Sequence, residues 1–131
     1  VNDTCAAAWR NYGTGWPGTN GVPSLAGSGA PVLCSSFTLT LGNCRGAPAV
    51  ATLFVGWRDS SVPTPWGGTM LVLPALSVTI DVPVGGEALP ATIPCDPALL
   101  GVHAFTQAME IDPGASNGVA FTPGMELVLG Y

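Results

Sequence analysis

The segment Phe37-Thr38-Leu39-Thr40-Leu41 alternates apolar and hydroxyl side chains, so that an extended backbone would have one apolar and one polar face. Such period-two alternation is typical of a β-strand with one buried face. Gly42 and Asn43 follow at once and favour a turn. We therefore predict a half-buried strand here, and similar patterns recur along the chain.

Seven further segments are rich in β-branched, aromatic or alternating residues and are separated by turn-forming residues. They are residues 49–57, 70–73, 77–82, 87–93, 101–111, 119–122 and 125–131. Pro90 restricts its segment to an edge or a bulge, and the last two segments are predicted to form a hairpin. Seven or eight short strands at this spacing predict an all-β fold, an antiparallel β-sandwich of Ig-like or jelly-roll-like type.

The chain of 131 residues has the length of a single domain. Thirteen prolines argue against an all-helical fold, and one short helical turn is expected at Pro97, after the potential cap Asp96. Residues 1–24 are dense in glycine and turn signals and predict an extended N-terminal arm or loop. Residues 25–131 predict the β-sandwich.

Charged residues are scarce, at 8% of the chain against about 25% in an ordinary soluble domain. There is no lysine, and three arginines face eight carboxylates for a formal net charge of −5. Binding to nucleic acid or an anionic membrane needs a basic patch, so both are poor candidate partners. Residues 60–80 are uncharged, but prolines and glycines interrupt them, so we expect no membrane-spanning segment.

The four cysteines are Cys5, Cys34, Cys44 and Cys95, and none form a close CxxC pair. Wide spacing in a chain rich in glycine and proline favours two disulfides and an oxidising compartment. Three pairings are open, and we prefer Cys5–Cys34 with Cys44–Cys95. The chain begins without Met or a leader, as a secreted protein does after signal removal. Asn2 lies in an Asn-x-Thr pattern and is a candidate glycosylation site.

Turn and strand motifs near both ends resemble small β-rich modules of secreted proteins from Planctomycetes-type and related bacteria. This resemblance covers most of the chain and implies a β-rich fold and a secreted, extracellular or cell-surface location, without an active site. In that family a cysteine often follows the Tyr-Gly-Thr-Gly run, where this chain has Trp16; Cys34 is then a substitute partner for Cys5. The matching residues are 12–15, 17–23, 93–94, 97–101, 105–108, 112–115, 117–118 and 124–130.

Candidate catalytic and metal-binding residues are few. His103 is the only histidine, and residues 13–18 fit a GxGxxG pattern but lack the strand–helix context of a dinucleotide site. Glu110 and Asp112 share a predicted strand face, where paired carboxylates could hydrolyse glycosides, and Asp112 with Asn117 could bind calcium. Structural roles in strands and turns explain these residues better. We predict no catalytic residue, cofactor or metal ligand, and hence no enzyme.

Too few charged residues are present to cover an ordinary surface, and Glu126 is the only charge guarding the last predicted strand as an edge. We therefore predict an extracellular structural protein that self-assembles into a filament or surface layer, with the N-terminal segment as a donor in strand addition. The alternative is a secreted carbohydrate-binding or adhesion module that binds surface glycans through tryptophans. Candidate subunit contacts are Trp9, Tyr12, Trp16, Trp66 and Val128.

Overall fold

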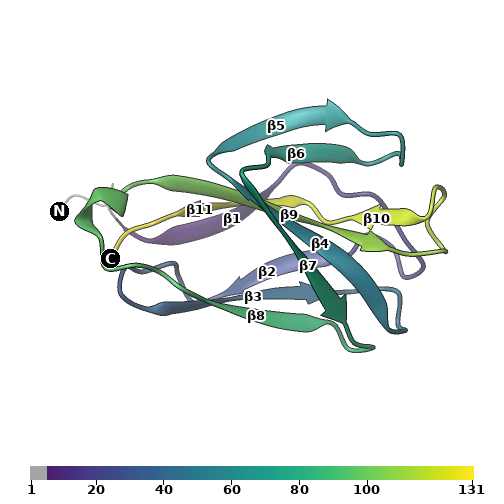
Figure 1. Cartoon of the computed structure of the whole chain (residues 1–131), viewed down its shortest axis with the longest axis horizontal. Helices are drawn as coiled ribbons and strands as arrows, with labels where there is room; N and C mark the ends of the chain where they lie inside the picture. Colours follow the sequence, from purple (N-terminus) through teal and green to yellow (C-terminus); the bar gives the residue numbers. More distant parts are fainter. Residues whose placement is uncertain (1–5) are drawn as a thin grey trace.

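The computed structural model describes residues 6–131 and is all-β (Figure 1). Cys5 and Asn2 lie outside the described residues. The 3-10 turn η2 (Pro97–Leu99) is capped by the carboxylate of Asp96, as predicted. No helix in the described part of the chain has the length and apolarity needed to cross a membrane. The strands are β1 (Ala8–Tyr12), β2 (Ser24–Ser28), β3 (Ser36–Gly42), β4 (Ala49–Gly56), β5 (Arg58–Pro63), β6 (Thr69–Leu73), β7 (Leu76–Val82), β8 (Glu87–Thr92), β9 (His103–Ile111), β10 (Val119–Phe121) and β11 (Gly124–Val128).

The strands form three layers, which Figure 1 shows edge-on. The main sheet lies in the middle, with the order β1-β11-β9-β4-β7 and with β10 also paired to β9. A small sheet, β2-β3-β8, covers its inner face, and the β5–β6 hairpin packs on its outer face. All strand pairs are antiparallel. The predicted antiparallel β-sandwich is confirmed.

The core lies between the main and small sheets. Phe37, Leu39 and Leu41 point into it and are at most 8% exposed, whereas Thr40 on the opposite face is exposed. Burial of each such side chain contributes about 1.5–3 kcal/mol. Period-two alternation in β3 therefore predicted the buried face correctly.

Gln107, which is fully buried, joins the β5–β6 hairpin to the outer face of the main sheet. Its Oε1 accepts from the Leu71 amide at 2.9 Å, and its Nε2 donates to the carbonyls of Thr69 and Thr122, each at 3.0 Å. The amide oxygen and both amide protons are thus bonded to backbone groups of two segments, strand β6 and the residue that follows β10. A buried polar side chain satisfied in this way fixes the position of the hairpin.

The eight predicted strands are all present, but β1, β2 and β5 were not predicted, and the last hairpin was predicted wrongly. Strands β10 and β11 do not pair with each other; both pair with β9. The register shifts by one residue between the pairs Phe121↔Met109 and Met125↔Thr106. Pro123 lies in this interruption and has no N–H to donate to a ladder.

Strand β1 covers the edge that the sequence predicted to be open. It pairs antiparallel with β11, from Ala8↔Val128 to Tyr12↔Gly124. The N-terminal segment is thus already added as a strand, but to its own sheet. Over a hundred residues separate the two partners, so the local sequence contains no sign of this pairing.

The preferred disulfide pairing was wrong. Cys34 is bonded to Cys95, with the Cα atoms 4.4 Å apart, while Cys44 is buried and forms no disulfide within residues 6–131. The cause is the pairing of β3 with β8, whose register begins at Ser36↔Thr92. It brings the segment before β3, with Cys34, next to the segment after β8, with Cys95. The bond is compatible with an oxidising, extracellular location.

Candidate functional site

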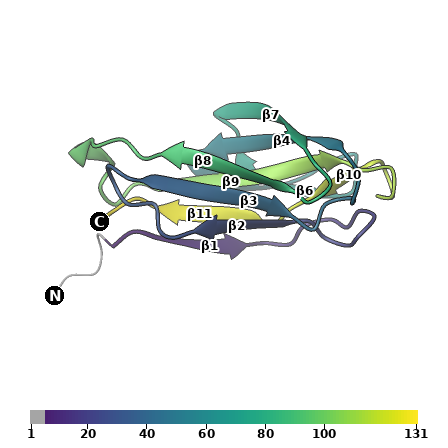
Figure 2. The same ribbon diagram turned by 90° about the horizontal axis from the view of Figure 1, so that it is seen from below.

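Exposed apolar side chains lie on β7, one edge of the main sheet. Within the described chain, β7 pairs with β4 alone. Figure 2 shows β7 lying beyond β8, so the small sheet stops short of it. The side chains of Leu76 and Val78 are 58% and 41% exposed, although their register partners Val55 and Leu53 turn toward the core. The first half of the inner face of β7 is therefore left open to water, whereas Val82 at its end is buried.

The backbone of this strand is weakly protected against pairing. Soluble β proteins guard their edges with Lys, Pro, inward charges or bulges. Residues 76–80 have no charge and no proline, and their register with β4 is regular. Asp81 is the first charged residue along the strand. We call the strand Leu76–Val82, with its unpaired backbone side, the β7 edge.

Further apolar side chains lie close to the start of β7. Trp57 and Leu73 are 60% and 57% exposed, and they line a hollow of about 220 Å³ together with Arg58, Pro74 and Ala75. Two exposed side chains of this size beside one hollow exceed the scattered single residues that are normal on a protein surface. Exposed apolar side chains thus lie on the inner face of β7 and, separately, on β6 and at Trp57 between β4 and β5.

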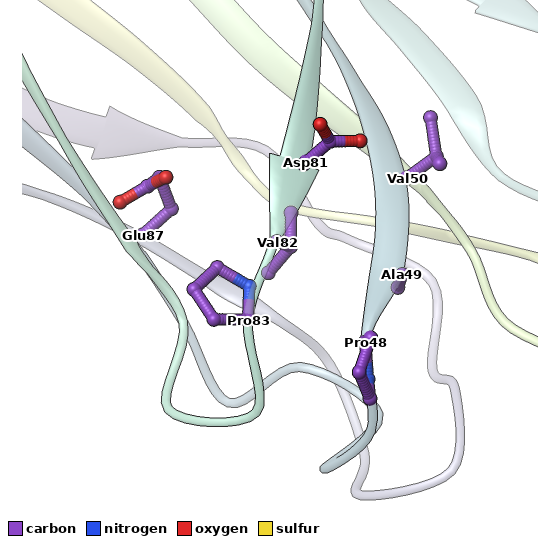
Figure 3. A pocket seen from close by; sticks show the side chains of 7 residues that line it. All are labelled: Pro48, Ala49, Val50, Asp81, Val82, Pro83 and Glu87. Atoms are coloured by element: carbon purple, nitrogen blue, oxygen red, sulfur yellow. The ribbon is translucent and has the colours of Figure 1, made fainter.

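A second hollow, of about 510 Å³, lies at the other end of β7 (Figure 3). Most of its walls are apolar, and its two carboxylates, Asp81 and Glu87, come from different strands. Figure 3 shows Pro83 between them. The lining residues are Pro48, Ala49, Val50, Asp81, Val82, Pro83 and Glu87. Its chemistry suits an apolar side chain.

Three of the five predicted contact residues are engaged within the chain. Trp9 packs against the core, and its Nε1 donates to the Gly29 carbonyl at 3.1 Å. The Tyr12 hydroxyl donates to the carbonyl of Leu71, and burial raises the pKa of Tyr12 to about 12. Trp16 forms a β-bridge with Phe121.

The other two predicted contacts are more accessible. Trp66 is 40% exposed, and Val128 is partly exposed on the outer face beside Arg10. As subunit contacts, all five residues remain predictions. Leu76 and Val78 were not predicted as contacts from the sequence, and Trp57 was considered only among the tryptophans that bind glycans in the alternative function. The signal that could have found the first two is the uncharged run 60–80, which ends in an alternating strand.

His103 belongs to a charged cluster on the outer face of β1, β11 and β9. The two oxygens of Glu126 lie 2.6 Å from Arg10 Nη2 and 2.7 Å from His103 Nδ1. The hydrogen bond from His103 and the charge of Arg10 lower the pKa of Glu126. Because Arg10 and His103 are mostly exposed, the cluster contributes little stability and mainly orients β1.

Glu110 and Asp112, the predicted carboxylate pair, are both 1% exposed but have different surroundings. Burial is the largest cause that raises the pKa of Glu110, and the neighbouring charge of Asp112 adds to it. The Oε2 atom of Glu110 accepts from the Arg45 amide at 3.1 Å, and its Oε1 has no hydrogen-bond partner among residues 6–131. Burial also raises the pKa of Asp112, but hydrogen bonds from Thr19 and Gly114 outweigh it, and the net pKa is lowered.

Asp112 uses these bonds to hold the N-terminal loop against the β9–β10 turn. Its Oδ2 accepts from the Thr19 amide and its Oδ1 from the Gly114 amide, both at 2.8 Å. A Cβ at Gly18 would collide with this carboxylate, so glycine is required there. Asn117, which the sequence offered with Asp112 as a possible calcium ligand and which was not predicted as one, is exposed. Among residues 6–131, no three His, Cys, Asp or Glu side chains are grouped as metal ligands.

Comparison with family models, curated proteins and solved structures finds no match for this chain. The resemblance to Planctomycetes-type modules therefore remains a prediction. Function is therefore inferred from the exposed surface of the chain itself.

Proposed function

We propose that this protein is an extracellular structural subunit that self-assembles into a filament or surface layer. The single observation that supports the proposal most is the exposure of four large apolar side chains at and near β7, namely Leu76, Val78, Trp57 and Leu73, each 41% exposed or more. Water contact of such side chains is unfavourable by about 25 cal/mol per Å² of apolar area. Copies of the chain that cover one another remove this surface from water.

The charge distribution supports the same function. Eleven large apolar residues of the described chain are exposed, while the whole sequence has only three cationic side chains. Charges of both signs normally keep small domains dispersed. The Cys34–Cys95 disulfide joins segments 61 residues apart and suits a subunit that must last outside the cell.

The proposal is tested by sedimentation velocity of the purified protein over a range of concentrations, with negative-stain microscopy of the same samples. We expect species larger than 13.2 kDa that grow with concentration and form regular filaments or sheets. A single species of monomer mass at every concentration, without fibres or layers, would refute self-assembly.

A carbohydrate-binding or adhesion module is the second candidate. The observation that favours it is the 60% exposure of Trp57 beside Arg58 and an open hollow, since an aromatic plane next to a polar group can stack on a sugar ring. Glycan-array binding that disappears in both Trp57→Ala and Trp66→Ala, with unchanged melting, would support this candidate. Equal binding by the variants and the wild type would contradict it.

A further inference from the structure

We propose that the β7 edge is a contact between two copies of this chain, in which each β7 pairs antiparallel with the other around a two-fold axis at Thr79. This inference rests on the proposed self-assembly and names one surface that takes part in it. A two-fold contact closes as a dimer, so growth into a filament or layer needs a second contact between such dimers. A symmetric contact of this kind uses the same patch on both copies, so the patch must be complementary to itself. The sequence and faces of β7 meet that condition.

The residue pairing follows from the length of the strand and its alternating faces. Thr79 is the midpoint of Leu76–Val82, so a centre at this residue pairs the whole strand. Val78 then lies opposite Ile80 of the second copy on the inner face, and Ser77 lies opposite Asp81 on the outer face. If the two-fold axis lay between two residues instead, side chains of the inner face would lie opposite side chains of the outer face. The alternation of side chains along paired strands does not allow this.

Charge is also compatible with this register. Asp81 is the only ionisable residue of the strand, and a two-fold axis at Thr79 places it opposite a serine and not opposite its own copy. An axis at Asp81 would bring two carboxylates face to face, which destabilises a cross-strand pair. The uncharged residues 76–80 thus lie at the centre of the contact.

Leu76 connects the contact with the hollow at the end of β7. In the proposed register, Leu76 of one copy lies opposite Val82 of the other. Val82 lines the hollow of about 510 Å³, whose walls are mostly apolar. Leu76 is 58% exposed in the single chain, and the second copy offers it an apolar site on the same side of the sheet.

The outer edges of β8 and β1 are less suited to this role. The outer edge of β8 contains Pro90, which cannot donate to a ladder. The edge strand β1 has five residues and includes the charged Arg10. Strand β7 is longer, uncharged at its centre and apolar on its inner face. Pairing two β7 strands joins two main sheets into one continuous sheet, so its backbone groups form hydrogen bonds.

Disulfide cross-linking of the whole protein tests the register. In the proposed contact the Cα atoms of the two Thr79 residues are about 4.5–5.5 Å apart, within the range that a disulfide spans. Thr79→Cys should therefore give a covalent dimer under mild oxidation. Ser77→Cys alone should not, because the two copies of that residue lie about 13 Å apart along the strand. Ser77→Cys mixed with Asp81→Cys should cross-link, and wild type measures the background from native thiols.

A charge placed on the edge tests the surface without depending on the register. Val78→Lys puts an ammonium group on the inner face at the centre of the contact and should weaken self-association about tenfold or more. Val62→Lys is the matched control, because Val62 is 56% exposed on β5, away from β7. Melting curves verify that both variants fold.

Three outcomes are distinct. The β7 contact is supported if Thr79→Cys forms the covalent dimer and if Val78→Lys, but not Val62→Lys, associates more weakly than wild type. Assembly that continues unchanged in Val78→Lys, without cross-linking through Thr79, overturns this inference but leaves self-assembly in place. A wild type that stays monomeric at all concentrations overturns both.

Discussion

Replacement of Gln107 by alanine should release the β5–β6 hairpin from the main sheet. The fully buried amide makes three hydrogen bonds, to backbone groups of Leu71, Thr69 and Thr122. At about 1 kcal/mol per bond they contribute about 3 kcal/mol, and the lost methylene adds about 0.8 kcal/mol. If water enters the space that the Gln107 side chain leaves and bonds to the freed backbone groups, the loss of unfolding free energy falls toward about 2 kcal/mol. We therefore expect unfolding free energy to fall by about 2–4 kcal/mol.

Urea unfolding followed by tryptophan fluorescence measures this loss, and hydrogen exchange of the Leu71 amide locates it. Gln107→Met is the matched control, because methionine fills similar space without hydrogen bonds and separates lost packing from lost bonding. In both variants the Leu71 amide should exchange faster than in wild type. A loss below about 1 kcal/mol in Gln107→Ala, or unchanged exchange at Leu71, would refute the view that Gln107 holds the hairpin.

Three further predictions concern the disulfide and the buried carboxylates. Replacing Cys34 and Cys95 by serine opens a loop of 61 residues and should lower the free energy of unfolding, measured in urea, by about 4 kcal/mol. If the oxidised and the reduced wild type had the same urea midpoint, this prediction would be contradicted. The lowered pKa of Asp112 stabilises the fold above its ordinary value of 3.8, and this contribution is lost as pH falls through the lowered pKa, so Asp112→Asn should show a flatter acid limb in pH-dependent unfolding. Glu110 should change stability with pH in the opposite direction. Because its pKa is raised, the folded chain still holds a proton above pH 4.5 that the unfolded chain has released. Stability therefore falls as pH rises, until the pH passes the raised pKa. Glu110→Gln should remove that fall, and an unchanged pH slope would show that Glu110 does not cause it.

The strand predictions succeeded where a segment shows its own alternation. Phe37 to Leu41 alternates without interruption and forms β3, and Pro90 lies on an edge strand as expected. Strand β1, with the sequence AWRNY, lacks such a pattern. It is extended because β11 supplies the ladder, and only the folded chain brings these strands together. This tertiary pairing overrides a weak local preference.

The candidate site was less predictable for the same reason. Scarcity of charge indicated that apolar surface would remain exposed, but did not indicate where. Trp9 and Trp16 resembled free contacts in the sequence and are partly buried against their own chain. Leu76 and Val78 were not predicted as contacts from the sequence and are exposed, because the small sheet does not cover the start of β7.

The sequence by itself determined the all-β class, the positions of the eight patterned strands and the deficit of charge, because alternation, turn residues and composition act over a few neighbouring positions. Tertiary structure decided which strands are neighbours, that Cys34 bonds Cys95, and that β7 is an open edge. Each of these depends on segments tens of residues apart that meet only when the sheets close, since backbone hydrogen bonds and apolar burial select partners across the whole chain.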